Sequence, residues 1–190
     1  ASEASLALAA FYTRLQEDLQ ARGLLRTDGG GPDTLFTDTI LVRNFETIAL
    51  EEEYVRGAGL EPAPQGTGAG TIKKWLQPVR VQVAFGTRVP QKLRSDARAE
   101  VATYVTRLAR VTSHPINLVN SDGNFHVLFM GEDDRGTLVD RVQRLVPQAD
   151  LQSLQLLGRL PRDIHCLVIA FASEPGGNEY GEAVALIRAE

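Results

Sequence analysis

Three histidines are the residues of this chain best suited to hold a metal ion or move a proton. They are His114, His126 and His165. A zinc-binding helix needs two histidines one turn apart, and no two of these have that spacing. His114 precedes a proline, whereas His126 and His165 lie in apolar runs that predict strands. We therefore expect structural or surface roles for all three, and no metal ligand among them.

A second candidate for chemistry is the group formed by Ser121, Asp122 and His126, which could begin a nucleophilic triad. Turn chemistry accounts for the same residues, because Ser121-Asp122-Gly123 is a sequence that favours a tight turn. The turn is the better interpretation, so these residues predict no catalysis.

Acidic and glycine-rich runs supply the remaining candidates. Glu51-Glu52-Glu53 and Glu132-Asp133-Asp134 could collect a hard cation, but EF-hand spacing is absent and both runs are expected to be solvated. Residues 66–70 resemble a phosphate-binding loop only in their letters, since no strand precedes them. No Walker lysine and no G-x-S-x-G elbow occurs in the sequence. The sequence thus predicts no catalytic residue and no cofactor.

Length and composition indicate one globular domain, either alone or with an appended arm. The chain has 190 residues, 43% of them hydrophobic, and a formal net charge of -4. Its lysines and arginines are scattered, which argues against nucleic acid as a partner. The longest uncharged apolar run, residues 164–173, is shorter than the roughly 20 residues that span a bilayer, so we predict no transmembrane segment.

The amino-terminal end suggests export from the cytoplasm. The only methionine is Met130, and the chain begins with small residues from Ala1 to Ser5. Such a start remains after removal of a signal peptide, although a trimmed sequence would look the same. We expect an extracytoplasmic protein.

Hydrophobic spacing predicts two amphipathic helices in an amino-terminal arm, residues 1–55. The first runs from Ser5 to Arg22, and the second carries Leu41, Phe45 and Ile48 on one stripe with Asp38 as its N-cap. Five glycines and two prolines in residues 56–71 predict a mobile linker before a domain at residues 72–190.

The domain at 72–190 is predicted to be α+β, with a mixed or antiparallel sheet. Strict alternation predicts a strand at 79–85, and helical spacing predicts a long helix at 91–111 that covers one face of the sheet. Residues 116–119 and 125–130 are expected to form a hairpin around Asn120-Ser121-Asp122-Gly123. Further elements are two short helices at 138–146 and 150–157 and a strand pair at 164–172 and 179–188.

Three residues are predicted to be structural. Trp75 should be largely buried at the entry to the first strand, and Asn124 should satisfy local backbone groups after the turn. Cys166 lies in the most apolar stretch, where we expect a buried, unreactive thiol with a raised pKa.

Several short motifs together carry a resemblance to a known family. They are Arg43-Asn44-Phe45 with Glu53-Tyr54, Lys74-Trp75, Pro78 to Val81, Asn124-Phe125, Cys166, and the closing Ala183 to Ile187. From about Asp38 to its end, the chain resembles the bacterial domain of unknown function 2927. Members of that family are described as exported proteins, several of them lipoproteins.

The resemblance implies a longer pattern, with a cysteine and a Glu-Glu helix reminiscent of zinc peptidases after the last hairpin. A disulfide from Cys166 to that cysteine is implied in the same way. The order of elements is also similar to the amino-terminal half of zincin-type peptidases, which is an analogy of fold and assigns no chemistry.

Two main hypotheses follow. The first is an exported domain of unknown function that binds a cell-envelope protein or a small ligand, in the periplasm or as an anchored lipoprotein, without catalysis. The alternative is a degenerate zincin-like metallohydrolase whose active-site helix lies beyond residue 190. A weaker third hypothesis makes residues 75–189 a small-molecule binding module, which would need a deep apolar cleft.

Overall fold

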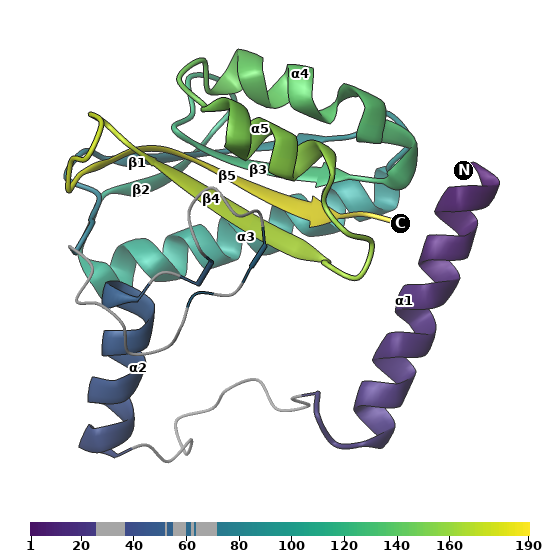
Figure 1. The fold of residues 1–190 in the computed structure, drawn as a ribbon, viewed down its shortest axis with the longest axis horizontal. Coiled ribbons are helices and arrows are strands. Elements are labelled where there is room, and N and C mark those ends of the chain that lie inside the picture. Colours follow the sequence, from purple (N-terminus) through teal and green to yellow (C-terminus); the bar gives the residue numbers. More distant parts are fainter. Residues whose placement is uncertain (26–36, 52, 55–59, 62, 64–71) are drawn as a thin grey trace. The chain divides into compact units, whose positions relative to one another are not determined.

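A computed structural model describes residues 1–25, 37–51, 53–54, 60–61, 63 and 72–190 (Figure 1). The chain forms two compact units, one made of Ala1–Ser5 with Lys73–Glu190 and the other of Leu6–Ile72. Most of the predicted linker at 56–71 lies outside the described residues.

The helices of the amino-terminal arm are α1 (Glu3–Ala21) and α2 (Asp38–Leu50). The N-cap of α2 is Thr37, whose hydroxyl accepts a hydrogen bond from the Ile40 amide at 3.2 Å. The prediction that Asp38 caps this helix was wrong by one residue. Thr37 takes the extended backbone conformation that a cap requires, and Asp38 supplies negative charge to the first turn.

The larger unit contains a five-stranded mixed sheet in the order β2-β1-β3-β5-β4. All neighbouring strands are parallel except β4 and β5, which pair antiparallel. The strands are β1 (Val79–Phe85), β2 (Ile116–Val119), β3 (Phe125–Met130), β4 (Cys166–Ala172) and β5 (Tyr180–Arg188). The helices are α3 (Gln91–Thr112), the 3-10 turn η1 (Glu132–Asp134), α4 (Arg135–Leu145) and α5 (Leu151–Gly158).

Helices cover both faces of this sheet. Figure 1 shows α3 on one face and α4 with α5 on the other. The α3 face is built by alternation, since Val79, Val81 and Val83 of β1 pack with Val105 of α3. On the opposite face Leu128 and Val184 are fully buried. The predicted α+β fold with a long helix over a mixed sheet is confirmed.

The predicted hairpin between 116–119 and 125–130 was wrong. β2 and β3 both run parallel to β1 and lie on opposite sides of it. Residues 120–124 therefore cross β1, held there by the side chain of Gln82. Gln82 Nε2 donates to the Asn120 carbonyl at 3.1 Å, and its Oε1 accepts from the Gly123 amide at 3.2 Å.

The crossing needs a glycine at position 123. A Cβ atom there would lie 2.5 Å from Cβ of Gln82 and 3.1 Å from the Arg80 carbonyl oxygen. Turn chemistry correctly marked this segment, but the residues serve a crossing and not a hairpin.

The side chain of Asn124 replaces backbone hydrogen bonds that β1 lacks where the crossing interrupts the sheet. The Asn124 amide donates to the Arg80 carbonyl as β3 begins. The residues before Asn124 form the crossing and do not pair with β1. Among the described residues, the Arg80 amide and the Pro78 carbonyl therefore have no backbone hydrogen-bond partner on this side. The Asn124 side chain takes over, with Oδ1 accepting from the Arg80 amide at 2.7 Å and Nδ2 donating to the Pro78 carbonyl at 3.1 Å. Asn124 is buried, and its partners lie on a distant strand, so the expectation of local partners was wrong.

We expect Asn124→Ala to lower the free energy of unfolding by about 2–4 kcal/mol, because it leaves the Arg80 amide of β1 and the Pro78 carbonyl before it without their partner in a partly buried place. Urea denaturation followed by circular dichroism measures the change. The matched control is Asn120→Ala, which removes an exposed side chain from the same crossing. Equal stability of the two variants would contradict the role assigned to Asn124.

Candidate functional site

The place where this topology would offer a ligand crevice is the carboxyl edge of β1 and β3. The connection after β1 passes over one face of the sheet and the connection after β3 over the other, as Figure 1 shows. Such a switch point is the usual ligand site of open α/β sheets. The residues that follow the two strands therefore decide what this edge can do.

The crevice is closed by a carboxylate of the chain itself. Asp134, in η1 after β3, is buried, and its Oδ1 accepts from the amide and the hydroxyl of Thr87 at 2.7 and 2.8 Å. Gly86, between β1 and Thr87, leaves room for that carboxylate, since a Cβ at this position would overlap it. Asp134 thus joins the ends of β1 and β3 across the switch point.

Arginines occupy the backbone carbonyls around the same edge. Arg94 of α3 donates to the carbonyls of Val89 and Gly86 at 2.8 and 2.7 Å. Arg141 of α4 donates to the Phe85 carbonyl at 3.0 Å. These guanidinium groups satisfy strand ends that a ligand or water would otherwise bind, which makes their role here structural.

A second charged group lies at the ends of β3 and β5. The Glu132 side chain, only 9% exposed, forms ion pairs with Arg188 at 3.3 Å, Arg162 at 2.8 Å and Arg135 at 3.6 Å. Desolvation alone would raise the pKa of Glu132. The hydrogen bond and charge of Arg162, with the charges of Arg135 and Arg188, outweigh it and lower that pKa below its ordinary value.

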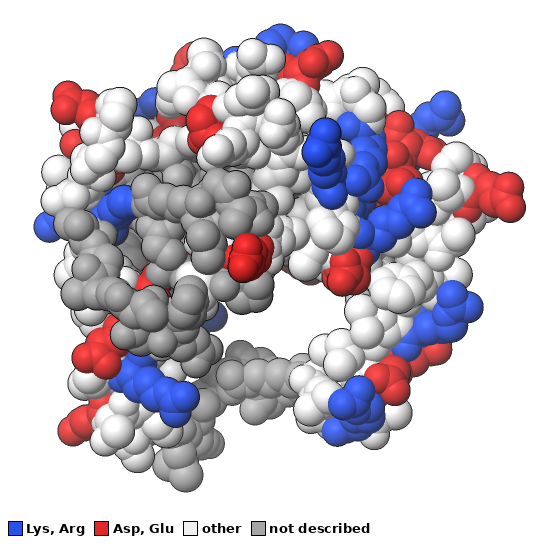
Figure 2. Space-filling view, in the orientation of Figure 1, with Lys and Arg blue, Asp and Glu red and all other residues white. Residues whose placement is uncertain are grey.

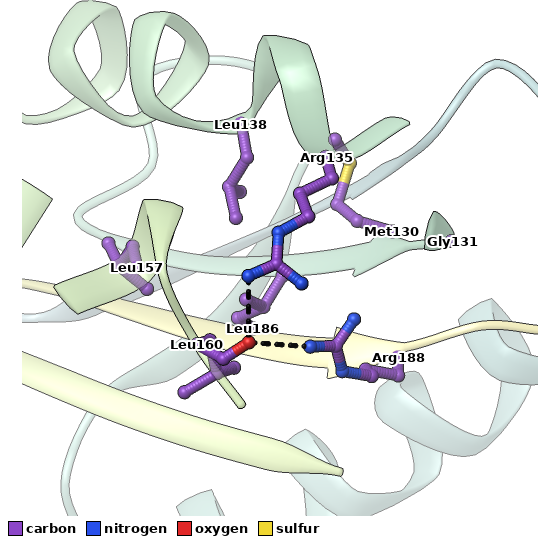
Figure 3. Close-up of a pocket in the computed structure, with 8 residues that line it drawn as sticks. All are labelled: Met130, Gly131, Arg135, Leu138, Leu157, Leu160, Leu186 and Arg188. Carbon is purple, nitrogen blue, oxygen red and sulfur yellow. Dashed lines mark hydrogen bonds between the residues drawn. The ribbon is translucent and has the colours of Figure 1, made fainter. Parts of the chain in front are cut away.

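Arg188 is the most enclosed member of this group. Its side chain is 6% exposed and donates to the carbonyls of Leu160, Pro161 and Ile164 as well as to Glu132. Arg135 donates to the same Leu160 carbonyl at 3.0 Å, so two guanidinium groups converge on one oxygen (Figure 3). The cluster ties β3, β5 and the segment after α5 together.

A small pocket lies beside this cluster, between the ends of β3 and β5 and the helices α4 and α5. Figure 3 shows its lining, which combines Arg135 and Arg188 with Leu138, Leu157 and Leu160. Its cavity volume is about 10 Å³. That is close to the minimum for a single water and far below the roughly 300 Å³ of a small-molecule site.

The amino-terminal residues also reach this edge. Ser5 Oγ donates to Glu190 Oε2 at 2.7 Å, while Glu190 Oε1 accepts from the Glu132 amide at 2.6 Å. The Ser2 amide donates to Asp133 at 2.9 Å. The prediction of a solvated face for residues 132–134 was wrong for Glu132 and Asp134. Glu132 pairs with Arg162 and Arg188, and Asp134 is buried with Oδ1 bound to Thr87, while its Oδ2 has no hydrogen-bond partner among the described residues.

The histidines do not converge. His126 is 3% exposed on the α4 face of β3, and its two ring nitrogens have no hydrogen-bond partner within the described residues. His114 Nε2 lies 2.9 Å from the Gln77 carbonyl oxygen, and His165 is exposed. In the part of the chain that the structure describes, no group of three or more His, Cys, Asp or Glu side chains is placed to hold a metal ion.

Ser121 and Asp122 contact each other and not His126. The Ser121 hydroxyl donates to the Asp122 carboxylate at 3.2 Å, and Asp122 takes a positive φ of 56°. Its carbonyl accepts from Arg80 Nε at 2.7 Å. These contacts are those of the crossing loop.

Cys166 differs from its prediction and Trp75 follows it only in part. Cys166 is exposed, so the expectation of burial was wrong, although desolvation does raise the pKa of its thiol. The apolar run around it forms an edge strand whose alternate side chains face outward. Trp75 is half-buried, with its ring 6.2 Å from that of Phe125 and 5.9 Å from that of Tyr180.

Figure 2 shows acidic and basic side chains interspersed on the visible face. No helix within the described ranges combines the length and apolarity that a membrane span requires.

The fold and its edge define an α+β domain with a mixed five-stranded sheet whose switch point is filled by the chain's own side chains. A family model described as a protein of unknown function, DUF2927, matches residues 38–190. The chain therefore belongs to this family, as the resemblance predicted. Searches among curated proteins and among solved structures gave no match.

Glu132→Gln should lower the free energy of unfolding by about 3–5 kcal/mol, because it removes the anion of a buried ion pair and leaves the Arg188 charge unbalanced. Chemical denaturation at neutral pH measures this loss. The control is Asp96→Asn, which breaks the exposed pair with Lys92 and should change stability by less than about 1 kcal/mol. Similar effects of the two substitutions would show that the Glu132 cluster is not structural.

We also expect stability to fall as pH drops below about 6.5. Burial lowers the pKa of His126 below its ordinary value of 6.5, so the unfolded chain binds this proton at a higher pH than the folded protein. His126→Leu should therefore flatten the decline between about pH 6.5 and 5, measured by urea denaturation across that range. Leu128→Ala, the matched control on β3, should lower stability without changing the slope. An unchanged slope in His126→Leu would contradict this assignment.

Proposed function

We propose that this chain is a non-catalytic domain that acts by binding another protein in the cell envelope. The observation that carries the proposal is the row of large apolar side chains that α2 exposes. Ile48 is 82% exposed and Phe45 57%, followed by Leu41 at 49%. They lie at the spacing of one helical stripe, and no residue of α2 is buried.

An exposed apolar stripe of this kind favours aggregation unless another surface covers it. Phe45 and Ile48 are flanked by Ile40 and Val42, which are also exposed, while Arg43 lies on the opposite side of the helix. Amphipathic helices with anchors at this spacing bind apolar grooves of partner proteins. The position of α2 within residues 38–190 places the stripe inside the family domain.

The carboxyl edge supports binding over catalysis. Asp134 and Thr87 fill the switch point, and the pocket beside Arg188 has room for about one water. These observations give no support to the small-molecule alternative. The described residues likewise give none to the metallohydrolase, since no metal-holding group is found among them.

The proposed location in the cell envelope depends on the resemblance to a family whose members are described as exported. Fractionation of cells that carry the complete gene tests it. Recovery of the protein with the cytoplasmic marker alone would overturn this part of the proposal and leave the binding part standing.

A photo-reactive amino acid placed at Phe45 or Ile48 should crosslink to one discrete partner protein in intact cells, because both side chains lie on the exposed stripe. The matched control is the same group at Arg43, on the opposite side of α2. Mass spectrometry of the crosslinked bands measures the outcome. Identical crosslinks from all three positions, or none from Phe45 and Ile48, would contradict a role for the stripe.

A further inference from the structure

The edge strand β4 is the feature that the proposed function leaves unexplained. Within the described residues, β4 pairs with β5 alone and forms one end of the sheet. Its seven residues, Cys166 to Ala172, include no charged residue and no proline. Natural edge strands are usually blunted by lysine, proline or a bulge, because an open edge templates pairing with another strand. The irregularity at Phe171/Ala172 leaves the residues before it in regular register.

The direction of the backbone groups on β4 follows from its pairing. The Arg188 amide donates to the His165 carbonyl, which makes residues 165 and 188 a hydrogen-bonded pair. Alternation along an antiparallel ladder then turns the backbone groups of Cys166, Val168 and Ala170 away from β5, toward the open edge. The side chains of these three residues are also exposed, with Val168 at 53%.

We propose that β4 pairs with β4 of a second copy of this chain, antiparallel and centred on Val168. In this register Val168 faces Val168 of the other copy, and Cys166 faces Ala170 on either side of it. Each of these pairs exchanges both of its backbone hydrogen bonds. The sheets of the two copies become one continuous sheet, and the symmetry is that of a closed dimer.

The charges on the segments that flank β4 favour antiparallel pairing of two copies. The segment before β4 carries Arg159, Arg162 and Asp163, and Arg162 belongs to the Glu132 cluster, in which one carboxylate faces the three guanidinium groups of Arg135, Arg162 and Arg188. The segment after β4 carries Glu174 and Glu179. One flank is thus net basic and the other acidic. Antiparallel pairing of two copies brings unlike flanks together at both ends, whereas parallel pairing would bring like charges together.

This inference goes beyond the proposed function and does not depend on it, because β4 and α2 belong to different units. Sedimentation velocity of the chain should show a dimer at micromolar concentration. A monomer at all concentrations up to the millimolar range would overturn the proposal. A dimer that persists unchanged in the β4 variants below would place the interface elsewhere and also overturn it.

Two substitutions at Val168 separate pairing from folding. Val168→Lys places a charge at the centre of the dimer interface on an exposed side chain, and should weaken dimerisation about ten-fold or more. Val168→Pro removes an amide that points away from β5, so it should abolish the dimer and keep the β5 ladder. Circular dichroism checks that each variant is folded. If Val168→Pro unfolds, Val168→Lys still decides the question.

A cysteine at the centre tests the register. Val168→Cys in a Cys166→Ala background should form an intermolecular disulfide under mild oxidation, because facing Cα atoms in such a pair lie about 5.5 Å apart. Ala170→Cys in the same background is the matched control. Its two copies would lie about 14 Å apart along the strands and should not crosslink. Crosslinking of the control in place of Val168→Cys, or through Cys166 in the unaltered chain, would overturn this register.

Discussion

The crossing of β1 by residues 120–124 is the constraint on which the sheet depends. It sends β3 to the other side of β1 from β2, so that β1 lies inside the sheet and a switch point forms at its carboxyl edge. The Gln82 side chain donates a hydrogen bond to the crossing segment, and the missing side chain of Gly123 lets that segment lie close to β1. Asn124 restores the hydrogen bonds that the departing backbone leaves open. A strand order of this kind therefore requires specific side chains, and not apolar alternation alone.

The same topology creates an edge that the chain then fills. In an open α/β sheet the carboxyl ends of the strands expose carbonyl groups and invite a ligand. Here Arg94 and Arg141 donate to the carbonyls of Gly86 and Phe85 at the end of β1, and Asp134 joins the end of β3 to Thr87 after β1. Side chains of the described residues therefore occupy the edge at which such sheets usually bind a ligand.

Sequence reasoning predicted the elements well and their partners less well. Alternation in 79–85 and helical spacing in 91–111 depend on local geometry, so β1 and α3 appeared where expected. The supposed hairpin failed because a tight-turn sequence such as Ser121-Asp122-Gly123 fits a crossing loop equally well. No local signal states which strand lies between two others. That information resides in long-range contacts such as those of Asn124.

Charged residues show the same limit at the candidate site. The run 132–134 reads as solvated because its members are acidic, yet Glu132 is neutralised by Arg188, which follows 56 residues later. Arg188 could have been marked from the sequence because it directly follows the apolar run Ala183 to Ile187, and a charge in such a place requires a partner. Its counterion could not be chosen from the sequence, because the chain has 24 acidic residues and their order does not show which one lies near Arg188.

The two ends of the sheet differ in how they meet solvent, and this difference bears on assembly. β2 is only four residues long, which limits the number of hydrogen bonds that its edge can offer. β4 is longer and wholly uncharged, and its exposed backbone groups alternate with groups already bonded to β5. Evolution commonly blunts edges that are to stay free. In this domain one edge strand has four residues while the other has seven, none of them charged, and the longer edge is the one that we propose to pair.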